Sequence, residues 1–188
     1  KMKKIFTKSK TFYGFQDKEV EDETLVDLYE MVKNNATSFN CQPLRIIFIK
    51  SINAKKRLNP YMLENNKKKT FDAPVTAILA MDLSFYEDLP KNFSSMDVSF
   101  LFKGNPEFTH LTAFRNSSLQ GGYFIKAAHC LGLGTGPMSG FDNEGVDREF
   151  FANTDWKTNF ICNIGYGDET QTKPRERRYS FDEIAKIL

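Results

Sequence analysis

One long run of helical periodicity dominates the second half of the sequence. Between Pro106 and Leu131 apolar and small residues recur at helical spacing, and Gly132 follows as a helix stop. The run is well above the ~11–12 residues of an average helix. Its small residues permit close packing, so the pattern favours a central core helix, with a dimer contact as the alternative. Its apolar and small positions include Phe108, Leu111, Phe114, Gly121, Gly122, Ala127 and Ala128.

Three short apolar runs alternate along the chain with further helical stretches. The predicted strands are Leu44–Ile49, Val75–Met81 and 159–167. The predicted helices are 21–35 (with Asp22 as its N-cap), 51–58, Asn143–Phe151 and 180–188. Residues 65–74 are polar and predict a connection. Strands interleaved with helices, without a repeat or a linker, predict one α+β domain over residues 1–188, built on a small central sheet.

Composition narrows the class of protein. The 26 basic and 24 acidic residues give a net charge of +2, too even to suggest nucleic acid as the partner. No window approaches the ~20 apolar residues of a membrane span, and the basic N-terminus lacks the apolar stretch of a signal peptide. The three cysteines suit a reducing cytoplasm, and Cys41 and Cys130 are predicted to be small core residues. His110 and His129 lack partners at ligand spacing, so no metal site is predicted.

The glycine-rich stretch LGLGTGPMSGFD, residues 131–142, raises the question of a dinucleotide fingerprint. Pro137 or Ser139 stands where the third glycine of G-x-G-x-x-G is required, and the stretch follows a helix instead of a strand. A Rossmann dehydrogenase is therefore disfavoured. Backbone N–H groups around Ser139 could instead face a flat cofactor ring. A plain glycine-rich corner after the helix is the alternative, which the pattern alone favours.

Three further polar stretches are candidates for ligand contacts. Residues 36–43 place Thr37, Ser38 and Asn40 before a buried strand, where such groups bond either to local backbone or to a ligand. The run NNKKKT contains Asn66 and Lys69, and its usual meaning is a solvated turn. The run KPRERR, residues 173–178, could form a basic patch or a local anion site.

Taken in order, these stretches resemble a known family. The wording TSFNCQPLRIIFI, APVTAI, AFRNSSLQ, GLGTGPMSGFD and NIGYGD is similar to that of the FMN-dependent nitroreductases, most of all to the malonic semialdehyde reductase-like branch. The resemblance implies a nitroreductase-like α+β fold, with a small central mixed sheet flanked by helices. It also implies an intertwined homodimer that binds FMN at the subunit interface.

The resemblance assigns two groups of residues to the FMN phosphate. Lys10 and Thr11, in SKTFYGF, stand where the family has an arginine-rich sequence. The point charge of a lysine therefore replaces the bidentate guanidinium group of an arginine. Arg175 and Arg178 match the C-terminal phosphate contacts, and Arg177 could replace either of them.

The resemblance also assigns residues around the flavin ring. Asn66 and Lys69 match the pair at its pyrimidine edge. The loop facing N5 corresponds to Met138, Ser139 and Gly140, with Ser139 in place of the glutamate of many nitroreductases. The segment that reaches the flavin of the partner subunit corresponds to Thr37, Ser38 and Asn40.

The activity implied is a ping-pong oxidoreductase. NADH or NADPH would reduce FMN at N5, and a small organic acceptor such as malonic semialdehyde would then be reduced in the same pocket, with no dedicated acid–base side chain. One alternative is a broad nitroaromatic or quinone reductase. Another is a flavin-binding or sensing protein without turnover. A weaker alternative is a basic interaction module built on KKKT and KPRERR.

Overall fold

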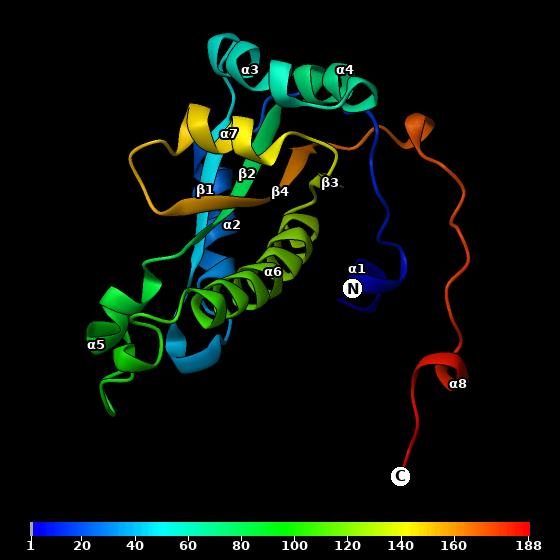
Figure 1. Ribbon diagram of the computed structural model, residues 1–188. Coiled ribbons are helices and arrows are strands. Elements are labelled where there is room, and N and C mark those ends of the chain that lie inside the picture. The colour runs from blue at the N-terminus through cyan, green and yellow to red at the C-terminus, as the bar shows by residue number, and fades with distance from the viewer. Residues whose placement is uncertain (1) are drawn as a thin grey trace.

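The computed structural model of the protein describes residues 2–188, and its centre is a four-stranded sheet (Figure 1). The strands are β1 (Leu44–Ile49), β2 (Val75–Asp82), β3 (Gly134–Met138) and β4 (Trp156–Gly165), in the order β1-β2-β4-β3. Every residue of β2 is buried. The predicted mixed sheet needs correction: its ladders are antiparallel, and the described parallel pairing is the isolated bridge Thr11–Thr135.

One face of the sheet is covered by α2 (Asp22–Val32) and the long helix α6 (Pro106–Cys130), as Figure 1 shows. Alternate residues of β2 point to this face because side chains alternate along a strand. They pack with apolar residues of both helices, and the cluster includes Leu28, Val75, Ala77, Leu79, Phe124, Ala128 and Ile164. A Cβ at Gly121 would lie 2.5 Å from the Phe160 ring, so this glycine lets α6 approach the sheet closely.

The predicted core helix is confirmed, but its apolar residues divide between two faces. Buried positions of α6 are largely small or polar, such as Ala113, Asn116 and Gln120. The large apolar side chains that indicated the helix are exposed: Phe108, Leu111 and Phe114, together with Leu119 and Tyr123. The core side of α6 therefore depends on close approach more than on bulk.

The other face of the sheet carries α3 (Ile52–Leu58), α4 (Glu64–Asp72) and α7 (Asn143–Phe150), with the short η2 (Asn59–Tyr61). The β2 residues that point to this face alternate with those that point to the first. The cluster here includes Ile49, Ile78, Ala80, Val146, Phe151 and Ile161. A third cluster lies at one end of the sheet, under η1 (Ser38–Asn40), η3 (Phe85–Asp88), α5 (Leu89–Asn92) and η4 (Ser99–Leu101).

The two ends of the chain lie on the same side of the molecule (Figure 1). Helix α1 (Met2–Thr7) lies against α6, while η5 (Glu169–Gln171) and α8 (Phe181–Ile184) belong to a C-terminal tail that extends away from the body. Large apolar side chains of this tail are exposed, among them Tyr179, Phe181, Ile184 and Ile187. Within residues 2–188 no helix is long and apolar enough to cross a bilayer.

The predicted polar connection over residues 65–74 is wrong, because most of it is helix α4. Its buried face is made by the polar residues Asn66 and Thr70, one turn apart, so no apolar periodicity marks it. Ion pairs Lys67–Glu64 and Lys68–Asp72 support its exposed face.

The glycine-rich stretch is also more ordered than predicted, because it contains strand β3. Gly132, at φ 80°, does end the preceding helix, but Gly134 is a strand residue. A Cβ at Gly134 would lie 2.6 Å from the Phe12 ring, so it serves close packing instead of a turn. Three smaller corrections apply: Glu21, not Asp22, is the N-cap of α2, Cys130 is exposed, and β4 begins at Trp156.

Candidate active site

The edge formed by β3 and α4 holds the loop predicted to face a flavin ring. Beyond β3, the Gly140 carbonyl accepts hydrogen bonds from Asn66 Nδ2 (2.9 Å) and from the Leu63 backbone N–H (3.1 Å). A Cβ at Gly140 would lie 2.6 Å from Asn66 Nδ2, so a larger residue would displace the buried amide. The structure therefore brings Asn66 together with the Met138–Gly140 loop.

The buried side-chain amide of Asn163 on β4 connects the elements of this edge. Asn163 accepts a hydrogen bond at 2.8 Å from the Thr76 hydroxyl and donates to the Lys69 carbonyl at 3.3 Å. Its Nδ2 also lies 3.4 Å from Thr70 Oγ1 and 4.0 Å from the sulfur of Met138. Asn163 thus ties the end of α4 to the end of β3 beneath the candidate ring site.

Lys69 is half-buried and faces a second cation across an aromatic ring. Its Nζ lies 5.5 Å from the centroid of Tyr13, and Lys173 Nζ lies 4.7 Å from the same centroid. Burial, and then the charge of Lys173, lower the pKa of Lys69 below its usual value. Two cations in such a setting favour an anionic ligand, which would relieve their repulsion.

A cavity of about 620 Å³ lies beside Tyr13 and is lined by residues from both the N-terminal and the C-terminal segments of the chain. Lys10 and Thr11 line it from the N-terminal segment, and Arg175 and Arg178 line it from the C-terminal tail. Its volume falls in the usual range of small-molecule sites. Four predicted phosphate contacts that are far apart in the sequence therefore share one polar, cationic cavity.

The individual contacts in this cavity separate the three arginines. Arg175 Nη2 donates to the carbonyls of Ser9 (2.7 Å) and Thr7 (3.1 Å), which fixes the tail against the N-terminal segment. Arg178 donates to nearby backbone, to the carbonyls of Glu176 at 2.9 Å and Arg177 at 3.2 Å. Arg177 instead pairs with Glu183 outside the cavity, which favours the assignment of Arg175 and Arg178.

The segment predicted to reach a partner's flavin lies elsewhere in the chain. Ser38 N–H donates to Asn116 Oδ1 (2.9 Å), and Asn40 Nδ2 donates to the Asn92 carbonyl (2.8 Å). Thr37 Oγ1 accepts from the Gln42 N–H at 3.1 Å. Across residues 2–188 no hydrogen bond joins these three residues to the cavity or to α4.

This segment also stores backbone strain. Phe39, Asn40 and Gln42 all have left-handed φ values, at 53°, 51° and 41°. Such conformations cost of order 1–3 kcal/mol each in non-glycine residues and concentrate at functional sites. The strained turn is a reason to treat this segment as part of a site, although a single chain does not bring it to the others.

Sequence reasoning missed three residues of this region: Tyr13, Asn163 and Lys173. Tyr13 stands in the quoted SKTFYGF and Lys173 begins the basic run, but no local pattern distinguishes either residue. Asn163 lies in a predicted strand, where an amide flanked by apolar residues is the signal that could have identified it. In the described part of the chain, no group of three or more His, Cys, Asp or Glu side chains is placed to hold a metal ion.

Known proteins resemble this chain over most of its length. The sequence pattern described as "Nitroreductase family" matches residues 8–166. A protein of Polynucleobacter asymbioticus named "Putative NADH dehydrogenase/NAD(P)H nitroreductase" is 48% identical over 187 residues, covering 100% of this chain and 95% of the relative. The chain therefore belongs to the nitroreductase family, a family of oxidoreductases.

Solved structures of low sequence identity share the fold. One, from Bacillus subtilis, is described as a "putative nitroreductase" and has a TM-score of 0.88 at 20% identity, over 99% of this chain and 98% of that one. Another, from Exiguobacterium sibiricum, is described as a "putative nitroreductase in complex with FMN", with a TM-score of 0.87 at 15% identity over 100% and 97%. Both have the same α+β nitroreductase fold as this chain.

Proposed function

We propose that the protein binds FMN along the surface that runs from the cationic cavity to the β3–α4 edge. The observation that carries the proposal is the convergence of Lys10, Thr11, Arg175 and Arg178 on one cavity. Tyr13, which lines that cavity, also lies beside Lys69, whose charge would be available to a polar edge of the ring. The donor set fits FMN: cations for a phosphate, then a cation and backbone groups for a polar ring edge.

The best-supported activity is an NAD(P)H-dependent reduction of a nitroaromatic or quinone acceptor. FMN supplies hydride transfer from the reduced nicotinamide to the acceptor. The name of the 48% identical relative supports a nitro acceptor, and nothing comparable supports malonic semialdehyde. The semialdehyde remains a second candidate, resting on the resemblance of the sequence to that branch alone.

The chain's own residues have distinct tasks in this reaction. Lys69 places a positive charge where an electron-rich ring needs stabilisation, and such preorganised charge in a partly buried site is effective because water is displaced. Asn66 and the Gly140 carbonyl hold the loop in register through their 2.9 Å hydrogen bond. Gly140 itself lets Asn66 approach the loop, because a Cβ there would lie 2.6 Å from Asn66 Nδ2.

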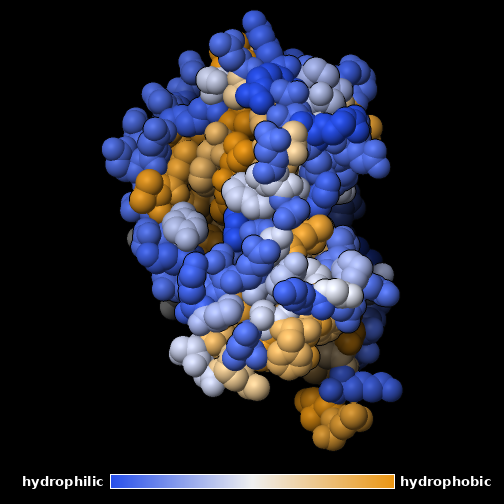
Figure 2. Space-filling model, turned by 60° about the vertical axis from the view of Figure 1, so that its left-hand side comes forward, coloured by the Kyte–Doolittle hydropathy of each residue, from blue (hydrophilic) through white to orange (hydrophobic). Residues whose placement is uncertain are grey.

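We also infer a homodimer, because one chain holds only part of the site. Thr37, Ser38 and Asn40 lie apart from the cavity, as expected for residues that serve a partner's flavin. The outer face of α6 and the C-terminal tail both expose apolar side chains that association would cover. The tail's apolar group is visible at the lowest point of Figure 2, set apart from the body. Sedimentation at the mass of a single chain would contradict the dimer.

The proposed binding site is tested by titrating FMN into the protein and following flavin fluorescence. Lys69→Met is expected to weaken binding at least several-fold, because it removes a half-buried charge beside the ligand. Lys68→Met is the matched control on the same helix, since the exposed Lys68 pairs only with Asp72. Equal affinity in the two variants would contradict the placement of FMN.

The proposed activity is tested by adding NADH or NADPH to the FMN-loaded protein without oxygen. Bleaching of the flavin absorbance, followed by recovery on adding an acceptor, is expected. A nitroaromatic, a quinone and malonic semialdehyde should be compared at equal concentration, because their rates separate the two candidate acceptor classes. Flavin that binds but is never reduced by either nicotinamide would support the flavin-binding or sensing alternative instead.

A further inference from the structure

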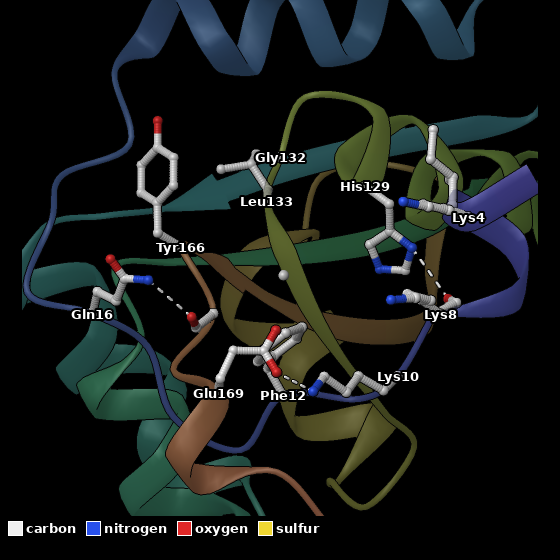
Figure 3. Close-up of a pocket in the computed structure, with 14 residues that line it drawn as sticks. Lys4, Lys8, Lys10, Phe12, Gln16, His129, Gly132, Leu133, Tyr166 and Glu169 are labelled. Atoms are coloured by element: carbon white, nitrogen blue, oxygen red, sulfur yellow. Dashed lines mark hydrogen bonds and ion pairs between the residues drawn. The ribbon is translucent and has the colours of Figure 1, made fainter. Parts of the chain in front are cut away.

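A second cavity, of about 350 Å³, shares part of the N-terminal segment with the cationic cavity. Figure 3 shows the ring of His129 beside Lys8 in this cavity. In the same view Lys10 is paired with Glu169, and its ammonium group lies over the ring of Phe12. The segment of Ser9 and Lys10 lines both cavities. Whatever fixes this segment from the His129 side therefore also fixes the wall of the proposed phosphate site.

A chain of hydrogen bonds reaches Ser9 from helix α6. Lys126 Nζ donates to Ser9 Oγ at 2.9 Å, and Ser9 Oγ lies 3.2 Å from His129 Nδ1. His129 Nε2 lies 2.9 Å from Thr135 Oγ1 on β3. An ammonium group only donates, so the Ser9 hydroxyl accepts from Lys126 and has its own proton free for His129. When the Ser9 proton points to His129, Nδ1 accepts it, and the imidazole is then neutral with its proton on Nε2.

The same segment is held at two backbone points. Arg175 Nη2 donates to the Ser9 carbonyl at 2.7 Å. The Phe12 N–H donates to the Thr135 carbonyl at 2.9 Å, and Thr11 pairs with Thr135 in a parallel bridge. Backbone hydrogen bonds therefore hold the segment from Ser9 to Phe12 at both ends. The Ser9 hydroxyl connects this segment to His129, which is titratable.

We propose that neutral His129 is a positioning residue for the FMN phosphate, acting through the Ser9 hydroxyl on the segment that carries Lys10 and Thr11. FMN affinity then falls when His129 is protonated, because a protonated Nδ1 can only donate, so that two cations, Lys126 and His129, compete for the Ser9 oxygen. This inference rests on the proposed function. The proposal makes the affinity for FMN depend on pH.

The surroundings of His129 are consistent with a neutral ring at pH 7. Burial, and then the charge of Lys126, lower the pKa of His129 below its usual value. Charged or titratable groups face the cavity from every element that packs there: Lys4 of α1, Lys8 and Lys10 after it, Lys126 of α6, Tyr166 after β4, and Glu169 of η5. Cations outnumber the single carboxylate, and that carboxylate is paired with Lys10.

Two effects of protonating His129 oppose each other, and Ser9→Ala separates them. The new positive charge attracts a phosphate, whereas the competition of two cations for the Ser9 oxygen loosens the phosphate-binding segment. In Ser9→Ala the hydrogen bond is absent at every pH, so only attraction remains. The phosphate's own ionisation near pH 6 is common to all variants and cancels in the comparison.

The test measures the dissociation constant of FMN between pH 8 and pH 5 in four proteins. Between pH 8 and pH 5 we expect the dissociation constant of the unaltered chain to rise by a factor about three- to tenfold larger than that of Ser9→Ala. This factor corresponds to the free energy of one hydrogen bond. Lys126→Met should move the midpoint to higher pH, because it removes a charge that lowers the pKa of His129. His110→Gln, which alters an exposed histidine on the same helix, should behave as the unaltered chain.

Nuclear magnetic resonance of the FMN-free protein supplies a readout independent of the cofactor. The chain has two histidines, so ¹⁵N shifts of the rings assign the tautomer of His129 directly, with His110→Gln as the aid. A neutral ring protonated on Nε2, titrating below the usual histidine range, is expected. The opposite tautomer, or identical pH profiles in the unaltered chain and Ser9→Ala, would overturn the inference. Failure to bind FMN at any pH would instead count against the proposed function.

Discussion

Replacing Asn163 by Leu should weaken both the fold and the grip on the flavin. The side chain is 2% exposed, and Thr76, its hydrogen-bond donor, is fully buried. In Asn163→Leu the Thr76 hydroxyl loses its 2.8 Å acceptor and keeps only the Thr70 carbonyl at 3.4 Å. The Lys69 carbonyl also loses the donor that lies 3.3 Å away.

The expected destabilisation follows from those contacts. A buried polar group left without its partner costs about 1–3 kcal/mol, and the weaker contacts to Lys69 and Thr70 add a fraction of that. We expect the free energy of unfolding to fall by about 2–3 kcal/mol. For a chain of this size that lowers the Tm by roughly 4–12 °C. Urea unfolding followed by circular dichroism measures the first quantity, and a thermal scan measures the second.

Thr76→Val provides the matched control because it breaks the same hydrogen bond from the other side. It should destabilise the fold by about 1–2 kcal/mol yet leave FMN affinity unchanged, since Asn163 still holds the Lys69 carbonyl. The double variant should be more stable than the sum of the single effects by at least about 0.5 kcal/mol, because both polar partners are then gone. Strict additivity, or an Asn163→Leu protein as stable as the unaltered chain, would refute this account of the buried amide.

Two further predictions concern the loop beyond β3 and the cysteines. Gly140→Val should weaken FMN binding about tenfold or more while Lys68→Met does not, because the new Cβ would lie 2.6 Å from Asn66 Nδ2; unchanged affinity would mean that the loop lies away from the ligand. Among the thiols, only exposed Cys130 should react rapidly with a thiol reagent at pH 8. Cys41 and Cys162 are buried, and burial raises their pKa values to about 11 and about 12, so they should react only after unfolding.

The sequence by itself determined the elements whose own side chains make their buried face. Leu44–Ile49 and Val75–Met81 are predominantly apolar runs, interrupted only by Arg45 and Thr76, and both are strands within a residue of their predicted limits. Helix α6 was also found from its periodicity and its glycine stop, although the large apolar side chains that indicated it are exposed. The family resemblance, carried by short stretches in fixed order, likewise needed no coordinates and is confirmed by the match over residues 8–166.

Tertiary structure alone decided the elements and contacts that depend on distant residues. Helix α4 buries Asn66 and Thr70 because Gly140 and Asn163 provide their partners, and no local pattern shows this. Strand β3 forms from glycines and a proline because β4 pairs with it and Phe12 packs over Gly134. The cationic cavity forms where Arg175 binds the backbone of Ser9 across nearly the whole chain, and such long-range hydrogen bonds are decided by packing, not by local sequence.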